Sequence, residues 1–297
     1  MATLYTHKDE NIAKTWVLMA VFLSIVIAIG WAISFYFNNP AVLVIAVIFA
    51  IVMNITSYWF SDKIVTAIAG ARPADEREFS DLHNIVENLA ITAGLPKPKI
   101  FIINDPAPNA FATGRNAEHA VVAVTTGLLS MLNRSELEGV IAHELSHIGN
   151  RDMLLSTVAV VLVGFVTLIS DFFLRSNILG GRGNDNNKGN PILMIIAVAL
   201  IVLAPIVATL LQLAISRKRE FLADASGALL TRYPEGLASA LQKIGAYATP
   251  MKRANNATAH LYISNPFGAK VAMGGIAKLF MTHPPIAERI KALVGTQ

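Results

Sequence analysis

The segment TWVLMAVFLSIVIAIGWAISFYFNNPAVLVIAVIFAIVMNITSYWFS, residues 15–61, contains no Asp, Glu, Lys or Arg and decides the fold class. It is interrupted by Asn38-Asn39-Pro40, which is typical of a tight turn. The apolar segments on either side, 15–37 and 41–60, are 23 and 20 residues long. At ~1.5 Å per residue, each helix is long enough to cross ~30 Å of hydrocarbon. The sequence therefore predicts an N-terminal transmembrane hairpin.

A second hydrophobic pair is predicted at 154–174 and 191–216, which makes four hydrophobic segments in two hairpins. The linker between them, 175–190, is rich in Gly and Asn and is expected to form a loop. Asp171 and Pro205 interrupt the two segments, so a re-entrant or cleft-forming hairpin is an alternative to two full crossings.

The composition favours a membrane protein and excludes several kinds of site. Hydrophobic residues make up 54% of the 297-residue chain and charged residues 15%, and the mean hydropathy is +0.53. The sequence has no cysteine, which excludes disulfides, iron–sulfur clusters, cysteine zinc fingers and thiol catalysis. The net charge of +4 is explained by basic residues near membrane segments, so nucleic-acid binding is not expected.

The remaining polar pieces fall on one side of the membrane if every hydrophobic segment crosses it, and they can then fold together. We expect a hairpin at 1–61, a mixed α+β domain in two parts at 62–153 and 217–297, and the second hairpin at 154–216. Basic residues on the domain side favour the cytoplasm, although Arg175, Arg182 and Lys188 on the other side weaken this indication. The basic residues on the domain side are Lys8, Lys14, Lys63, Arg72, Arg217, Lys218 and Arg219.

Local patterns predict several elements of this domain. Helical spacing extends over 75–93, and strands are expected at 98–104 and 120–125. Ser135 and Glu138 have the spacing of a capping box and predict the start of a second helix.

That second helix contains His143-Glu144-Leu145-Ser146-His147. Residues four apart on a helix project from the same face, so the two imidazoles can share one metal ion. Glu144 lies between them and is suited to act as the general base on a metal-activated water. The pattern predicts a catalytic zinc site, although other divalent ions also accept such ligands.

Two histidines leave a catalytic zinc one protein ligand short. Glu220 is the expected third ligand, and Asp224, four residues later on the same helical face, is placed to accept the free ring N–H of a ligand histidine. The alternatives are that both carboxylates lie on a solvated helix near the membrane, or that Glu138 or Glu235 is the third ligand. His7, His83, His119 and His260 have no partner spacing and are expected at the surface.

Taken together, these motifs resemble the M48 peptidase family, whose pattern is HExxH followed later by Glu-x-x-x-Asp. The resemblance covers nearly the whole chain: paired hydrophobic segments, Asn109-Ala110-Phe111-Ala112, the HELSH motif, RKREFLAD at 217–224, and Thr282-His283-Pro284-Pro285 with Arg289. HELSH alone is shared by many zinc peptidases, whereas the ordered set is specific.

The resemblance implies a zinc endopeptidase of membrane-protein quality control and the stress response, with one Zn²⁺ per chain. It implies a multi-pass protein of the bacterial inner membrane whose gluzincin-like domain faces the cytoplasm, and membrane-protein or unfolded polypeptide substrates. Asn109, Ala110, Phe111 and Ala112 would form an edge strand that pairs with the substrate backbone. His283 would stabilise the developing oxyanion, and Arg289 would brace the Glu220 carboxylate. The resemblance leaves the oligomeric state open.

A membrane scaffold or transporter with a structural metal is the non-enzymatic alternative. A structural zinc site closes with four protein ligands, and this chain has no cysteine to supply the fourth. Intramembrane charges that would mark a transport path are also scarce, with Asp171 as the single candidate. The sequence therefore favours the enzyme.

Overall fold

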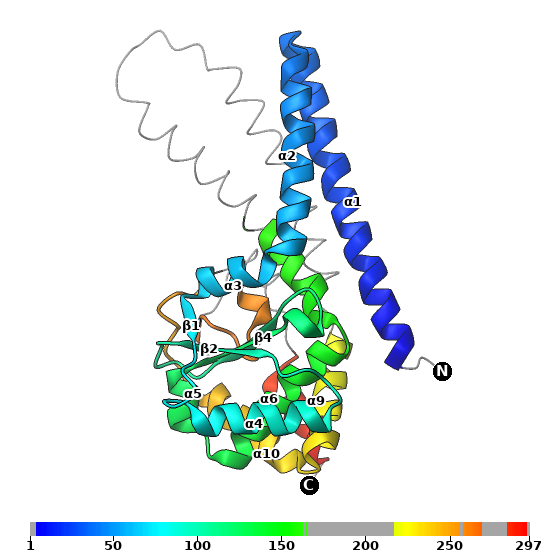
Figure 1. Ribbon diagram of the computed structural model, residues 1–297. Coiled ribbons are helices and arrows are strands. Elements are labelled where there is room, and N and C mark those ends of the chain that lie inside the picture. Colours follow the sequence, from blue (N-terminus) through cyan, green and yellow to red (C-terminus); the bar gives the residue numbers. More distant parts are fainter. Residues whose placement is uncertain (1–3, 163, 165–216, 256–257, 269–283, 296–297) are drawn as a thin grey trace.

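The computed structural model describes residues 4–162, 164, 217–255, 258–268 and 284–295. A long helical hairpin stands on a globular domain in which helices surround a small sheet (Figure 1). Most of the second predicted hydrophobic pair lies outside the described residues. Its start is part of the helix Asp152–Leu162, which is largely buried in the domain.

The hairpin consists of α1 (Leu4–Phe37) and α2 (Pro40–Trp59), which pack along each other. Asn38 adopts a left-handed backbone (φ 47), and the Asn39 side chain caps α2 by accepting from the Ala41 N–H, so the turn predicted at these residues is confirmed. Both helices are long and apolar enough to span a membrane, over Asp9–Phe37 and Pro40–Trp59.

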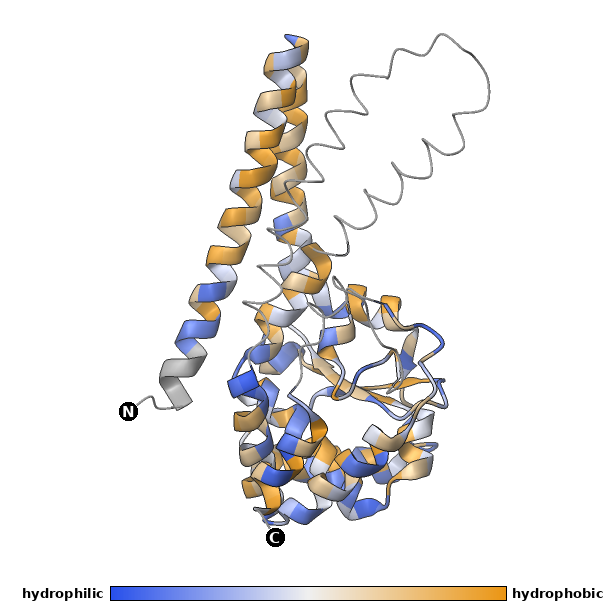
Figure 2. Ribbon diagram, turned by 180° about the vertical axis from the view of Figure 1, so that it is seen from behind, coloured by the Kyte–Doolittle hydropathy of each residue, from blue (hydrophilic) through white to orange (hydrophobic). Residues whose placement is uncertain are grey.

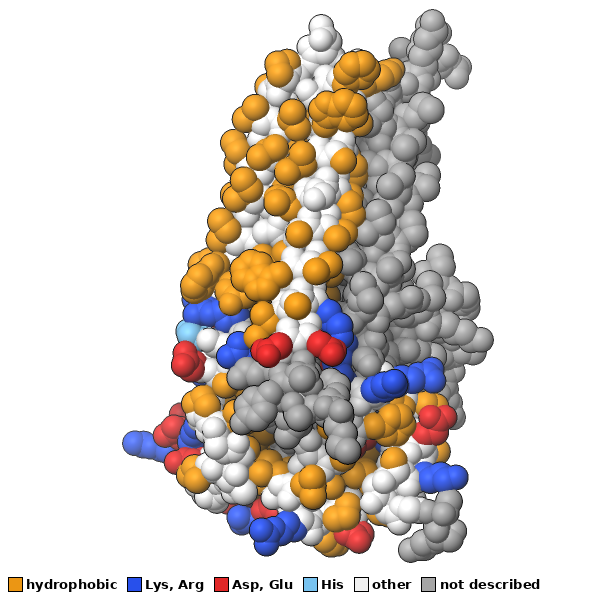
Figure 3. All heavy atoms as spheres, turned by 90° about the vertical axis from the view of Figure 1, so that its right-hand side faces the viewer, with side chains coloured by type: hydrophobic (Ala, Val, Ile, Leu, Met, Phe, Trp, Pro, Cys, Tyr) orange, Lys and Arg blue, Asp and Glu red, His pale blue; other side chains and the backbone are white. Residues whose placement is uncertain are grey.

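Hydrophobic residues line the hairpin over most of its length (Figure 2). Charged side chains gather where the hairpin meets the domain and over the domain itself (Figure 3). This distribution is the one expected of a membrane-spanning hairpin.

The sheet has four strands in the order β1-β2-β4-β3. β2 and β4 are parallel, and the two outer strands are antiparallel to their neighbours. The strands are β1 (Ala71–Pro73), β2 (Lys99–Ile103), β3 (Ala110–Thr113) and β4 (Val121–Thr125). The predicted strands at 98–104 and 120–125 are confirmed as β2 and β4, and β3 lies at an edge of the sheet.

The sheet separates two apolar cores. Ile102, Val122 and Val124 belong to the core formed with the helices of the domain. Phe111 and Ala123 belong to the other core, which also contains Leu18, Met19 and Phe22 of α1. The lower part of α1 is thus packed into the domain, so the hairpin and the domain share a core.

Helices complete the domain. They are α3 (Ser61–Ala69), α4 (Ser80–Thr92), α5 (Thr126–Met131), α6 (Arg134–Gly149), α9 (Arg217–Thr231), α10 (Pro234–Ala246) and α11 (Ile286–Val294), with short 3₁₀ turns η1 (Ala117–His119) and η2 (Ala259–Leu261). α9 and α10 both pack on α6, although residues 163 and 165–216 lie between α6 and α9 in the sequence. The two polar parts of the chain therefore form a common core in the described residues.

Two predicted helix starts are wrong by a few residues. α4 begins at Ser80 rather than at 75, because the Asp75 carboxylate accepts the backbone N–H groups of Arg77 and Glu78 and holds a turn there. The capping box of α6 is formed by Asn133 and Glu136, not by Ser135 and Glu138. The asparagine accepts from the Glu136 N–H, and the Glu136 carboxylate accepts from the Asn133 N–H.

Candidate metal centre

α6 presents the HELSH residues to the interior of the domain. His143 and Glu144 are buried, and His147 is partly buried one turn further on. The helical repeat places the two imidazoles on one face, where they meet edge to face with 4.7 Å between ring centroids and 3.2 Å between their Nε2 atoms. The sequence prediction that both rings share one face is confirmed.

Glu220 of α9 completes a group of three donors. Its Oε1 lies 3.6 Å from Nε2 of His147 and its Oε2 lies 3.9 Å from Nε2 of His143. A tetrahedral zinc ion with bonds of ~2.0–2.2 Å holds its ligand atoms about 3.3–3.6 Å apart, close to these separations. Two imidazoles and one carboxylate are also the donor set of catalytic zinc sites with one open position. The residues therefore fit a zinc ion.

The approach of α9 to α6 depends on Gly227. A Cβ on this residue would lie 2.9 Å from the backbone N of His143, so a larger residue would push the two helices apart. The glycine lets the carboxylates of α9 approach the imidazoles of α6.

The ring nitrogen of His143 that faces away from Glu220 contacts other residues of the domain. Its Nδ1 lies 2.9 Å from Oδ1 of Asp224, as predicted for a carboxylate that orients a ligand histidine. Arg289 of α11, fully buried, donates to both oxygens of Asp224 at 2.8 and 2.6 Å. Arg289 also forms the expected ion pair with Glu220, 3.8 Å between Nη1 and Oε2, but its shorter contacts are those to Asp224.

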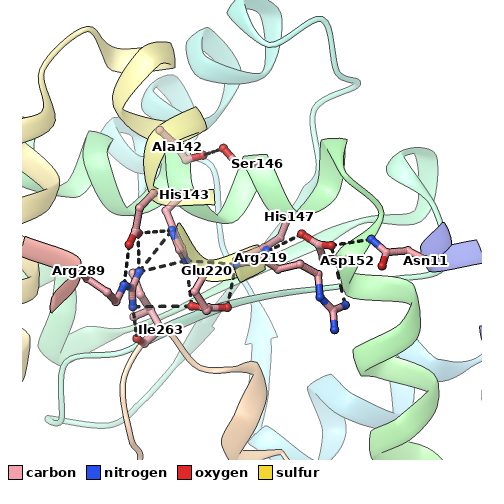
Figure 4. Close-up of polar contacts among 11 residues, drawn as sticks. Asn11, Ala142, His143, Ser146, His147, Asp152, Arg219, Glu220, Ile263 and Arg289 are labelled. Atoms are coloured by element: carbon pink, nitrogen blue, oxygen red, sulfur yellow. Dashed lines mark hydrogen bonds and ion pairs between the residues drawn. The ribbon is translucent and has the colours of Figure 1, made fainter. Parts of the chain in front are cut away.

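His147 is held by a residue that the sequence analysis missed. Its Nδ1 lies 3.1 Å from Oδ2 of Asp152, directly after α6. Arg151 adopts a left-handed backbone (φ 57), and the turn brings Asp152 back toward the helix. Asn11 of α1 donates to the other oxygen of Asp152 at 2.7 Å (Figure 4). The available signal was an acidic residue five positions after the second histidine, beyond a polar turn.

The surroundings shift the pKa values of the site in opposite directions. Burial lowers the pKa of His143 to about 4 despite its bond to Asp224. Burial alone would also lower the pKa of His147, but the hydrogen bond to Asp152 and the charge of Glu220 raise it to about 9. Burial raises the pKa of Glu144 to about 7. This value lies in the range where a carboxyl group both accepts and returns a proton near neutral pH.

β3 lies at the sheet edge beside the metal centre. In the antiparallel pairing with β4, Asn109 and Phe111 bond toward β4, so Ala110 and Ala112 face outward. The Ala110 carbonyl accepts from the Ile263 N–H at 2.9 Å. The backbone of Ala112 faces the Glu144 carboxyl group and lowers its pKa by less than burial raises it.

The side chains of Asn109 and Phe111, which were expected to take part in substrate binding, contact other residues of this protein. The Asn109 side chain pairs with the backbone of Ser264, accepting from its N–H at 3.2 Å and donating to its carbonyl at 2.9 Å. The Phe111 ring is buried against Tyr262, with 5.1 Å between ring centroids. At the Asn109 end, then, the outer edge of the strand is covered by residues 263 and 264.

The other candidate residues lie elsewhere. Glu138 pairs with Arg134 at 3.0 Å and Glu235 is exposed, so neither belongs to the metal centre. The prediction of a surface position is wrong for His260, which is buried with its Nε2 3.4 Å from the Ser156 carbonyl. His283 lies outside the described residues.

Comparisons with known proteins agree with this geometry. The profile of peptidase family M48 matches residues 76–297. A protease HtpX homolog of Caldanaerobacter subterraneus subsp. tengcongensis is 50% identical over 98% of this chain and 97% of its own length. A protease HtpX homolog of Pyrococcus furiosus is 49% identical over 94% of each chain.

The crystal structure of Ste24p from S. mikatae has the same fold. It is 18% identical, with a TM-score of 0.52 over 98% of this chain and 67% of that one. These likenesses support a membrane metalloprotease and give no support to the scaffold or transporter alternative. Because the family profile covers most of the chain and close relatives cover nearly all of it, the chain belongs to peptidase family M48.

Proposed function

We propose that this protein is a zinc-dependent endopeptidase that cleaves membrane-protein or unfolded polypeptide substrates in membrane quality control. The observation that carries the proposal is the convergence of two imidazole nitrogens and one carboxylate at separations that suit a single zinc ion. His143, His147 and Glu220 would hold the ion, one per chain. When bound there, zinc would act as a Lewis acid toward water and the scissile carbonyl.

Glu144 is the general base and then the general acid. Its carboxyl group is buried beside the three donors, and its raised pKa of about 7 suits it to take a proton from water and return it to the leaving amine. The backbone of Ala112 lies beside this carboxyl group, so Glu144 is next to the edge strand. Asp224 and Asp152 orient the two histidines. Arg289 keeps Asp224 ionised: burial would raise the pKa of Asp224, but the hydrogen bonds from Arg289 and His143 outweigh burial and lower this pKa to about 2.

The substrate backbone would add to the outer edge of β3. Since residues 263 and 264 cover the Asn109 and Ala110 positions, pairing would centre on Ala112, whose backbone lies beside the catalytic carboxyl group. Recognition through main-chain hydrogen bonds makes little demand on substrate sequence, which suits an enzyme that removes varied damaged proteins. His283 would contribute to oxyanion stabilisation.

The proposed topology has four hydrophobic segments in two hairpins, with the domain on the cytoplasmic side of the inner membrane. The described hairpin supports the first pair. The second pair, at 154–174 and 191–216, rests on hydropathy and on the position of the ligands, because α6 and α9 meet at one site from either side of this stretch. Two crossings, or none, bring both helices to the same side of the membrane.

Proteolysis by the purified full-length protein tests the proposal. Wild type in detergent should cleave an unfolded polypeptide such as casein, lose activity on chelation and regain it with zinc. Glu144→Gln should retain the metal and the fold but lose activity by about 10²–10⁴-fold, the contribution expected of a general base. Glu138→Gln is the matched control, a partly exposed glutamate on the same helix whose partner is Arg134. Near-wild-type activity in Glu144→Gln would contradict the role of Glu144.

A further inference from the structure

Asn11 joins the membrane hairpin to the metal centre. It lies near the lower end of α1 and is almost fully buried, with 3% of its surface exposed. The Nδ2 group of its side chain donates to the Asp152 carboxylate at 2.7 Å and to the Asn150 carbonyl at 3.3 Å. Asn11 therefore clamps both sides of the tight turn at Arg151 that carries Asp152.

Asp152 transmits this contact to a metal ligand. Its Oδ1 accepts from Asn11, and its Oδ2 lies against Nδ1 of His147 at 3.1 Å (Figure 4). Arg219 lies farther from the same carboxylate, 3.9 Å from Oδ1. A carboxylate held at one oxygen has less freedom to rotate, so it fixes the orientation and the tautomer of the imidazole bonded to its other oxygen.

The two ligand histidines are thus fixed from different parts of the protein. His143 is oriented by Asp224, which is held by Arg289 from within the domain. His147 is oriented by Asp152, which is held by a side chain of the membrane hairpin. Of these two arrangements, the one at His147 requires α1 to be packed against the domain.

We infer that Asn11 is a positioning residue of the metal centre, through which the docked membrane helix α1 fixes His147. The inference rests on the metal site proposed above and adds a residue outside the family motifs. As a consequence, the site reaches its full affinity for metal only when the base of the hairpin is packed against the domain.

Thr15 provides a matched control for a purely structural role. It lies one turn further along α1 and is 1% exposed, and among the described residues its hydroxyl donates to the Asn11 carbonyl within the same helix. Thr15→Val keeps the shape of this side chain and removes a polar group from the same buried face. A general loosening of α1 would affect Thr15→Val and Asn11→Ala alike, whereas a positioning role predicts an effect at Asn11 alone.

The zinc dissociation constant of the full-length protein in detergent, measured by chelator competition, tests the inference. Asn11→Ala should raise it about 3- to 10-fold, less than the ~10- to 100-fold expected for substitution of a direct partner of a ligand such as Asp152. Asn11→Gln, which keeps the amide donor, should recover part of the loss, and Thr15→Val should match wild type. The absorption spectrum of the cobalt-substituted protein should shift in Asn11→Ala and not in Thr15→Val, because it reports ligand geometry.

The double variant decides whether Asn11 acts through Asp152. If it does, Asn11→Ala adds no further loss of zinc affinity to Asp152→Asn. Three results would each overturn the inference while leaving the metal site intact. The first is a double variant whose loss of zinc affinity is the product of the two single losses. The others are an equal loss of zinc affinity in Asn11→Ala and Thr15→Val, and wild-type zinc affinity in Asn11→Ala. Failure of the wild type to bind zinc would instead overturn the proposed site, and this inference with it.

Discussion

At the scale of single residues, the chemistry depends on how differently two neighbouring histidines are surrounded. His143 bonds to Asp224, whose charge is offset by buried Arg289, so burial prevails and its pKa falls to about 4. His147 bonds to Asp152 and faces Glu220, and its pKa rises to about 9. The same residue type thus favours opposite protonation states at neutral pH.

This difference predicts a pH dependence of zinc binding. With its pKa raised to about 9, His147 is protonated at pH 7.5 in the metal-free protein, and zinc must displace that proton. The apparent dissociation constant should therefore fall about tenfold for each pH unit between 7.5 and 9, and level off above that range. Asp152→Asn removes the main group that raises this pKa and should flatten the slope. Chelator competition at several pH values measures both, and a flat profile in wild type would contradict the account.

At the scale of secondary-structure elements, the metal centre requires α6 and α9 to pack closely at Gly227. Gly227 of α9 lies against the backbone of α6 at His143, and a Cβ there would approach the His143 N to 2.9 Å. α9 carries Glu220 and Asp224, so the crossing distance sets the distance between ligands.

Gly227→Ala should therefore lower metal affinity and stability together. We expect about 1–3 kcal/mol of destabilisation, typical of overpacking at a tight contact, and a weaker affinity for zinc because α9 moves away from α6. Gly149→Ala, whose Cβ would meet the Leu95 side chain at 3.9 Å, is the control; it should leave zinc affinity unchanged and should not lower stability, because Ala is the better helix former. Thermal unfolding and chelator competition measure the two effects, and full zinc affinity in Gly227→Ala would contradict the dependence on this crossing.

The elements also show what the sequence can and cannot predict. Hydropathy located α1 and α2, short runs of apolar residues located β2 and β4, and the spacing of His143 and His147 placed both rings on one face, because each signal is local. Helix starts were wrong by a few residues because several polar side chains compete to cap the same turn, as Asn133 and Ser135 do. Asp152 and Asn11 were missed because 141 positions separate them, and only the fold brings them together.

At the scale of the whole molecule, the hairpin and the domain share a core, so the site and its membrane anchor form one unit. The proposed topology places the exposed residue Glu118 in the cytoplasm, and residue 186, outside the described residues, on the opposite side. The natural chain contains no cysteine, so single cysteines can be labelled without background.

Glu118→Cys and Asn186→Cys test this arrangement. A membrane-impermeant thiol reagent applied to intact cells should label the cysteine at 186 and not the one at 118, and permeabilised cells should show both. Labelling at 118 alone would reverse the orientation, and labelling at neither in intact cells would show that the second hydrophobic pair does not cross the membrane.

The central claim is that His143, His147 and Glu220 together hold one zinc ion. Elemental analysis of the purified full-length protein tests it most directly, with wild type, Glu220→Ala and Glu144→Gln compared side by side. The account predicts about one zinc per chain in wild type and in Glu144→Gln, because Glu144 is not a ligand, and a large loss in Glu220→Ala. Full zinc content in Glu220→Ala, or its loss in Glu144→Gln, would contradict it.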